Sequence, residues 1–293
     1  MTTHGILLLD KPAGLTSTAA LTRAKRILGI KKAGHTGALD PMATGLLPLC
    51  FGQATKVSQF LLESDKQYLA DIELGVTTDS GDADGKVTSE RTVPELTARQ
   101  IETVLDSFRG PIEQIPPMVS ALKHKGKRLH ELARQGIEVE RKPRSITIHQ
   151  LDRLDFDTNR LTVRVGCSKG TYIRSLAMDI GEVIGCGAHL SMLRREQSGP
   201  FSLDKATTLD ELSDRDQEAA RAALISPDQA LIHLDAISIK MEQARALRHG
   251  QPVSLEHGPV ELIRMYSDQE FIGVGGIDGL GVLRSKRLFD LKA

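Results

Sequence analysis

Apolar and polar residues alternate along two segments of the chain, with the period of two that is typical of a half-buried β-strand. In YLADIELGV the apolar side chains from Tyr68 to Val76 share one face, whereas Asp71 and Glu73 share the other. RLTVRVGCS repeats the pattern, with the apolar positions up to Cys167 facing inward. The shorter run GILLLD near the N-terminus is almost entirely apolar and predicts a buried strand.

Capping residues predict where several helices begin. Thr16 or Ser17 can cap a helix over TAALTRAKRIL, and Thr55 can cap a helix over KVSQFLLES. Thr97 and Gln100 have the spacing of a capping box before ARQIETVLDSF. KGTYIRSLAMDIGEVIG predicts a loop that opens a further helix.

The C-terminal part of the chain has a different pattern. Residues 203–230 are acidic and predict helix, and short strands over VELIRMY, QEFIGVGGI and GVLRSKRLF follow after about residue 236, with a short helix before them. The fold class is therefore α+β, a mixed, mainly antiparallel sheet flanked by helices. We expect two domains, residues 1–236 and a small β domain of residues 237–293.

Composition narrows the class of protein. The chain has 293 residues and a 40% hydrophobic content, which is ample for a core, and we find no apolar segment of membrane-spanning length. The four-residue apolar run near the N-terminus is too short for a signal peptide. Three cysteines form no CxxC pair, which argues against a disulfide framework or a zinc site. We expect a cytoplasmic protein without a metal and without a membrane segment.

Charge is balanced overall, at 38 basic and 38 acidic residues, but unevenly distributed. Residues 11–40 hold six Lys or Arg and one acid, and residues 121–150 hold eight Lys or Arg and three Glu. Residues 203–236 reverse the balance, with eight acids and three bases. Solvated surface explains most such runs, although two basic segments also suit a polyanion groove.

The loop GHTGALDPMATG contains the first candidate for chemistry, Asp40. Pro41 disfavours the α region for Asp40, and the nearby glycines permit a close approach of backbone to a ligand. Taken alone, the loop favours a simple Asx-turn. Arg174 could hold Asp40 ionised, or it could be an ordinary surface arginine.

Two tyrosines are candidates for pocket walls. Tyr68 and Tyr172 could each flank a planar ligand, although Tyr68 is on the apolar face of a strand, where core packing is the default. His35 could be a turn residue without a role. Spacing does not connect these residues with Asp40.

Six blocks connect them. Over most of residues 5–201 the chain contains, in this order, the blocks LLLDKPAGLTS, KKAGHTGALDPMATGLLPL, KQYLADIELGVTTDSGDADG, IPPMVSALKHKGKRLHELARQGIEVERK, GCSKGTYIRSLAMDIGE and GAHLSMLRREQSGPF. Together they resemble the bacterial TruB family, the tRNA pseudouridine-55 synthases. The tail FIGVGGIDGLGVLRSKRLF resembles, more faintly, the PUA-like RNA-binding domain that ends many members.

The resemblance implies roles for the catalytic residues. Asp40 would be the catalytic nucleophile, Arg174 its ion-pair partner, and Tyr68 the residue that stacks on the uracil and handles the proton from C5. Tyr172 and Leu193 would line the uracil pocket.

It also implies how RNA would be held. His35 would help to displace and hold the target uridine, Lys11 would support the loop or the RNA, and a basic thumb at about residues 120–145 would clamp the RNA arm.

The resemblance implies a reaction that needs no cofactor. The T-loop uridine at position 55 of tRNA would be flipped out, its N1–C1′ bond broken, the base turned, and a C5–C1′ bond formed. Attack of Asp40 on C1′, assistance of a glycal, and attack on C6 all stay open. The expected partner is the T arm of tRNA, with a tRNA-folding chaperone role as an alternative, and the expected state is a monomer.

Other functions also stay open. The chain could bind RNA without catalysis, modify another RNA, or be a thiol enzyme that uses Cys50, Cys167 or Cys186. The inward position of Cys167 favours buried structural thiols.

Overall fold

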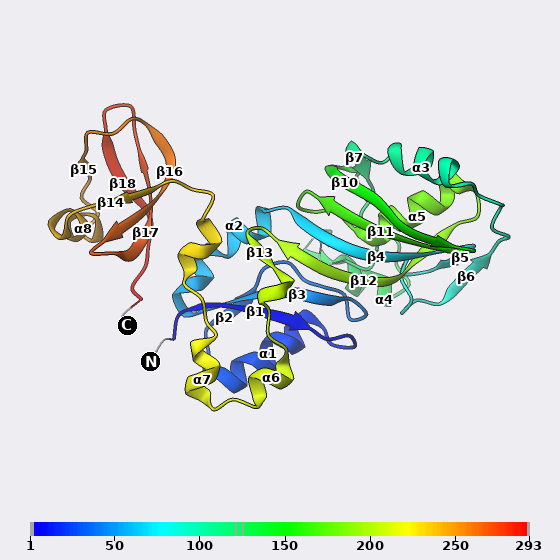
Figure 1. Ribbon diagram of the computed structural model, residues 1–293, viewed down its shortest axis with the longest axis horizontal. Coiled ribbons are helices and arrows are strands. Elements are labelled where there is room, and N and C mark those ends of the chain that lie inside the picture. The colour runs from blue at the N-terminus through cyan, green and yellow to red at the C-terminus, as the bar shows by residue number, and fades with distance from the viewer. Residues whose placement is uncertain (1–2, 121, 125, 292–293) are drawn as a thin grey trace.

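A large mixed sheet forms the body of the molecule. The structure is a computed structural model that describes residues 3–120, 122–124 and 126–291. The strands of the sheet are β1 (Gly5–Lys11), β2 (Ala33–His35), β3 (Thr44–Phe51), β4 (Lys66–Leu74), β7 (Gly110–Gln114), β10 (Arg144–Asp157), β11 (Arg160–Cys167), β12 (Ala188–Ser198) and β13 (Phe201–Ser202). Their order is β1-β3-β12-β4-β11-β10-β7, with β2 paired to β3 and β13 to β12 (Figure 1). Among these pairs only β3 with β12 is parallel, so the predicted mainly antiparallel sheet is confirmed.

The alternating pattern of β4 decides which side chains reach the core. Tyr68, Ala70, Ile72 and Leu74 are buried, and the residues between them are partly exposed. The prediction extended this strand to Val76, which is wrong. Gly75 has φ +87°, which turns the chain, and a separate hairpin of β5 (Val76–Thr78) and β6 (Val87–Glu90) follows.

Four helices pack along the sheet, and two of them, α1 and α3, begin at the predicted caps. They are α1 (Ser17–Leu28), α2 (Ser58–Glu63), α3 (Ala98–Asp106) and α5 (Ile173–Ile184). Thr16 caps α1, and the capping box of Thr97 and Gln100 is present at α3. α5 packs on β12 and β4, and α3 packs on β10 and α5 (Figure 1).

The predicted cap at Thr55 is wrong. The chain already turns at Gly52 into the 3₁₀-helix η1 (Gly52–Val57), so Thr55 lies inside that turn and its hydroxyl donates to the Gly52 carbonyl at 2.9 Å. α2 begins directly after η1 without a side-chain cap.

The predicted thumb lies between β7 and β10. It contains β8 (Lys123–His124), β9 (Lys127–Arg128) and α4 (Leu129–Arg134). Residues 121 and 125 of this segment lie outside the described residues. Its clamping role stays a prediction.

The acidic segment and the tail form the rest of the chain. The short helices η2 (Leu203–Lys205), α6 (Leu209–Ser213), α7 (Gln217–Ala222) and η3 (Pro227–Leu231) come first. A five-stranded sheet in the order β14-β16-β17-β18-β15 follows, with strands β14 (Ala236–Ser238), β15 (Val253–Ser254), β16 (Val260–Ser267), β17 (Glu270–Ile277) and β18 (Val282–Leu288), and helix α8 (Met241–Arg248). This sheet stands beside the main one in Figure 1 and has a core of its own around Ile263, Met265 and Leu283. The predicted domain boundary falls within β14 and stays a prediction.

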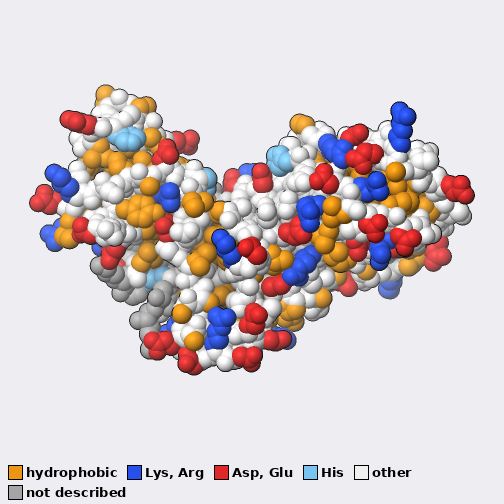
Figure 2. All heavy atoms as spheres, in the orientation of Figure 1, with side chains coloured by type: hydrophobic (Ala, Val, Ile, Leu, Met, Phe, Trp, Pro, Cys, Tyr) orange, Lys and Arg blue, Asp and Glu red, His pale blue; other side chains and the backbone are white. Residues whose placement is uncertain are grey.

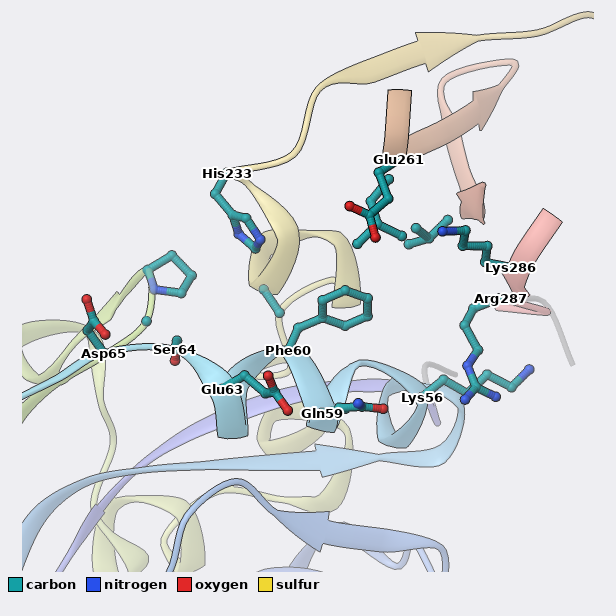
Figure 3. A pocket seen from close by; sticks show the side chains of 15 residues that line it. Lys56, Gln59, Phe60, Glu63, Ser64, Asp65, His233, Glu261, Lys286 and Arg287 are labelled. Carbon is teal, nitrogen blue, oxygen red and sulfur yellow. The ribbon is translucent and has the colours of Figure 1, made fainter. Parts of the chain in front are cut away.

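The C-terminal sheet also packs on the main body. Phe271, Val274 and Phe289 share a buried cluster with Ile6 and Leu46 of β1 and β3. Packing at this seam is incomplete, because a cleft of about 1090 Å³ lies between α2 and the C-terminal strands (Figure 3). The notch in the outline of Figure 2 separates the same two parts.

Candidate active site

A second, smaller pocket lies where β4 and β12 meet the loop before β3 and the segment that leads into α5. Its volume is about 290 Å³. Small-molecule sites begin at about 300 Å³, so this volume suits a single base or nucleoside. Five of the predicted site residues line it, namely Asp40, Tyr68, Tyr172, Arg174 and Leu193. The larger interdomain cleft contains none of them.

Buried polar groups hold the loop that presents Asp40. Ser17 Oγ accepts from the Leu39 amide at 2.7 Å and donates to the Leu39 carbonyl at 3.1 Å. Lys11 Nζ donates to the Pro41 carbonyl at 3.3 Å on the other side of Asp40. Because the backbone on both sides of Asp40 is fixed, its carboxylate is presented in a defined place.

Arg174 is the partner of Asp40. Its Nε lies 2.9 Å from Oδ2 of Asp40, and its Nη2 donates to Oδ1 at 3.3 Å. The Arg174 side chain is 4% exposed, whereas that of Asp40 is 37% exposed. A two-point ion pair fixes the carboxylate plane and leaves its open side to a ligand. Arg174 is therefore a buried residue of the pocket and not the ordinary surface arginine that the sequence also allowed.

The same guanidinium joins two further segments. Nη1 donates to the Ser80 carbonyl at 2.9 Å and Nη2 to the Val119 carbonyl at 2.7 Å, and Nε lies 3.5 Å from Oδ2 of Asp82. Arg174 thus ties the Asp40 loop to the acidic hairpin and to the base of the predicted thumb.

Burial and charge act in opposite directions on Asp40. Desolvation raises the pKa of Asp40 above its ordinary value, and the charge of Arg174 acts against that rise. Asp82 adds a smaller effect that raises the pKa further. The arrangement is a carboxylate of increased basicity at the edge of the pocket.

Aromatic and apolar side chains form the walls. Tyr68 and Leu193 are 8% and 6% exposed and belong to the main core cluster. Tyr172 is held by its backbone, since its amide donates to Gln114 Oε1 at 2.8 Å and its carbonyl accepts from Gln114 Nε2 at 3.1 Å. The two interpretations of Tyr68, core packing and pocket wall, therefore both apply.

His35 and Lys11 do not line this pocket. His35 lies on β2, and its Nδ1 has no hydrogen-bond partner among the described residues. Lys11 is fully buried, and its Nζ also donates to the carbonyls of Pro12 and Leu15. The structure therefore places Lys11 as a support of the loop, whereas the role of His35 stays a prediction.

Sequence reasoning missed Asp82, Lys66 and Arg195. Asp82 was one acid among several in a turn-rich loop, and no local pattern shows that it faces Arg174. Lys66 and Arg195 line the pocket and are buried. A signal for both existed in the period of two, because Lys66 shares the inward face of β4 with Tyr68 and Arg195 shares that of β12 with Leu193.

Neither thiol nor metal chemistry finds support in the described residues. All three cysteines are buried, and burial raises the pKa of Cys50 and of Cys167 to about 12. No group of three or more metal-ligating side chains occurs in the part of the chain that the structure describes. Within that part, every helix is also too short or too polar to cross a membrane.

Comparison with known families settles the identity of the fold. A family model described as "TruB family pseudouridylate synthase (N terminal domain)" matches residues 25–173, just over half of the chain. The chain belongs to the TruB family. Two further models, "tRNA pseudouridylate synthase B C-terminal domain" and "Pseudouridine synthase II TruB, C-terminal", match residues 174–233 and 236–289. The predicted membership is confirmed.

Two relatives that match over nearly their full length support the same family. A protein of Dechloromonas aromatica named tRNA pseudouridine synthase B is 53% identical over 98% of this chain and 96% of its own length. The protein of the same name from Francisella philomiragia is 48% identical over 98% of this chain and 95% of its own length.

Solved structures share the fold. A chain in the crystal structure of a Cbf5-Nop10-Gar1 complex is 28% identical, with a TM-score of 0.76 over 98% of this chain and 85% of that one. A chain in the structure of an H/ACA RNP bound to a substrate RNA containing 2'-deoxyuridine is 27% identical, with a TM-score of 0.74 over 98% of this chain and 85% of that one. The predicted pseudouridine-synthase-like fold with a small C-terminal β domain is confirmed.

Proposed function

We propose that this TruB-family chain isomerises uridine in tRNA to pseudouridine, at the T-loop uridine 55. The observation that carries the proposal is the Asp40–Arg174 pair at the mouth of a pocket that suits one base. Relatives named tRNA pseudouridine synthase B, at 53% and 48% identity, support the choice of reaction and of RNA.

Each pocket residue has a part in the reaction. The target uridine leaves the base stack, at a cost of about a few kcal/mol, and enters between Tyr68 and Leu193. Asp40, kept ionised by Arg174, faces the ribose and either attacks C1′ or assists glycal formation. The N1–C1′ bond breaks, the base turns, and C5 bonds to C1′.

One proton leaves in this sequence. C5 carries a hydrogen that is lost when the C5–C1′ bond is made, and the Tyr68 hydroxyl is the acceptor we assign to it. N1, released from C1′, takes up a proton in exchange, so the product has the composition of uridine and the reaction is an isomerisation.

Lysines and arginines outside the pocket would bind the RNA backbone. Phosphate contacts position an RNA without reading its sequence. We assign this role to the basic thumb and to the C-terminal domain of residues 237–293. The monomeric state, the cytoplasmic location and a tRNA-folding role belong to the same proposal.

Tritium release tests the proposal directly. A tRNA transcript with C5-tritiated uridine should release tritium with the wild type and should release none with Asp40→Asn, which keeps size and removes the charge. A transcript that lacks only the T-loop uridine should also release none. Turnover by Asp40→Asn, after deamidation is excluded, would remove Asp40 from its assigned role, and a wild type that binds without release would favour an RNA chaperone.

A further inference from the structure

Arg195 is the most deeply buried charge in the pocket. Its side chain lies on the inward face of β12 and is 1% exposed. Its Nε donates to the Leu46 carbonyl at 2.7 Å, and its Nη2 donates to the Gly37 carbonyl at 3.0 Å. Gly37 and Leu46 flank the segment that contains Asp40. One guanidinium therefore holds both ends of the catalytic loop.

Strand order puts the same residue beside Tyr68. β12 lies between β3 and β4, and Arg195 is directly opposite Gly45 on one side and Tyr68 on the other. Both side chains line the pocket, and the Arg195 charge acts on the Tyr68 phenol. Neighbours directly opposite on one face of an antiparallel pair have Cβ atoms about 5 Å apart, which places the guanidinium beside the Tyr68 side chain.

Gly45 allows this close packing of strands. It has φ +98°, and a Cβ built there would lie 2.4 Å from the Arg195 carbonyl oxygen. Any side chain at this position would push β3 away from β12. The absence of a side chain at Gly45 therefore lets the end of the Asp40 loop pack directly against the backbone of Arg195.

Neutral oxygens surround the Arg195 charge. Within the described ranges no carboxylate within 4.0 Å pairs with it, and the hydrogen bonds of its side chain go to the carbonyls of Leu46 and Gly37. The charge of Arg195 lowers the pKa of Lys11, His35 and Lys66, each of which is lowered more strongly by burial. For Tyr68, burial raises the pKa of the phenol and the Arg195 charge acts against that rise. A buried charge without a counter-ion is costly, so packing alone does not explain an arginine here.

We infer that Arg195 is a positioning residue that fixes the Tyr68 hydroxyl and the Asp40 loop relative to each other, so that one nucleotide meets the carboxylate at its ribose and the phenol oxygen at C5. This rests on the proposed function. In the last step the phenol oxygen of Tyr68 takes the C5 proton and passes its own hydroxyl proton to solvent. The C5–H bonding pair returns to the uracil ring, and N1 takes up a proton from solvent. Tyr68 begins and ends this step as the neutral phenol, and the neighbouring Arg195 charge stabilises negative charge that develops on the phenol oxygen.

The experiment is single-turnover pseudouridine formation at saturating enzyme. It compares a tRNA transcript made with ordinary uridine and one made with C5-deuterated uridine. Arg195→Lys keeps the charge but loses the fork that reaches the carbonyls of Leu46 and Gly37 from beside Tyr68. We expect it to slow the reaction at least about tenfold, which corresponds to about 1.4 kcal/mol in the barrier. We also expect its C5 deuterium isotope effect to exceed that of the wild type, because proton removal becomes slower than the other steps.

Arg194→Lys is the matched control. Arg194 is the adjacent arginine of β12, is 36% exposed and pairs with Asp10 at 2.6 Å. Its substitution should leave both the rate and the isotope effect at their wild-type values.

Every outcome decides the inference. An unchanged rate for Arg195→Lys, or a slower rate with an unchanged isotope effect, would mean that Arg195 only supports the loop, and would overturn it. Arg195→Gln serves as the second variant. If neither variant unfolds cooperatively, Arg195 has only a structural role, which would also overturn the inference. If the wild type forms no pseudouridine, the proposed function is refuted instead. The two failures can be told apart because the wild-type measurement involves no substitution.

Discussion

Replacing Arg174 with methionine tests the electrostatic basis of the site. Methionine keeps much of the length of the side chain and removes the bonds of the guanidinium to Asp40, to Asp82 and to the carbonyls of Ser80 and Val119. Loss of one partner of a buried ion pair costs about 3–5 kcal/mol. The full penalty applies to Asp82, which is 6% exposed, and only part of it to Asp40, which is 37% exposed. We expect the free energy of unfolding to fall by about 3 kcal/mol.

Activity should fall further than stability alone explains. Asp40 loses one charge-assisted hydrogen bond, which contributes about 1.5–3 kcal/mol, together with the ion pair to Nε. Loss of about 3–4 kcal/mol from the transition state corresponds to a rate lower by about 10²- to 10³-fold. The measurement is single-turnover tritium release at a temperature where the variant is folded.

The pH dependence gives the sharper result. Burial raises the pKa of Asp40, and Arg174 opposes that rise. If the ionised carboxylate is required, activity is present above this pKa and is lost as pH falls through it. Without Arg174 the pKa rises further, so the acid limb of the pH–rate profile moves to higher pH.

A surface arginine supplies the control. Arg164 pairs with Glu196 at 2.9 Å, with side chains 38% and 25% exposed, and Arg164→Met should cost at most about 1 kcal/mol. Its pH–rate profile should match the wild type. If Arg174→Met kept both the wild-type rate and the wild-type acid limb, the electrostatic reasoning would be refuted.

Three further predictions concern the loop, the cleft and the thiols. Ser17→Ala removes both bonds to Leu39 and should lower the free energy of unfolding by about 1–3 kcal/mol, measured by urea denaturation, with a parallel loss of turnover; unchanged stability would contradict the clamp. Lys286 and Arg287 lie at the basic end of the interdomain cleft in Figure 3, and replacing both by Gln should weaken tRNA binding. The slope of log binding constant against log salt concentration should fall by about 0.7–0.9 for each phosphate that the variant no longer neutralises. An unchanged slope would place the RNA elsewhere. Replacing all three buried cysteines by serine should leave turnover per folded molecule unchanged, and a drop in that turnover would revive a thiol mechanism.

Local sequence determined most of the elements of the fold. The period of two in β4 and β11, the cap at Thr16 and the capping box at Thr97 each depend on residues within a few positions, so the chain itself encodes them. Family blocks added Asp40 and Arg174 as a pair. The misplaced cap at Thr55 shows the limit of this reasoning, since an earlier turn decided where the helix began.

Only the tertiary structure decided which distant groups share a charge environment. Asp82 reaches Arg174 because the acidic hairpin folds back over the start of α5, and Arg195 reaches both the Asp40 loop and Tyr68 because β12 lies between β3 and β4. Strand order and loop packing depend on interactions across the whole domain, and burial changes the energy of a charge only after those interactions exist. The sequence by itself thus determined which residues could act, and the fold decided which of them act together.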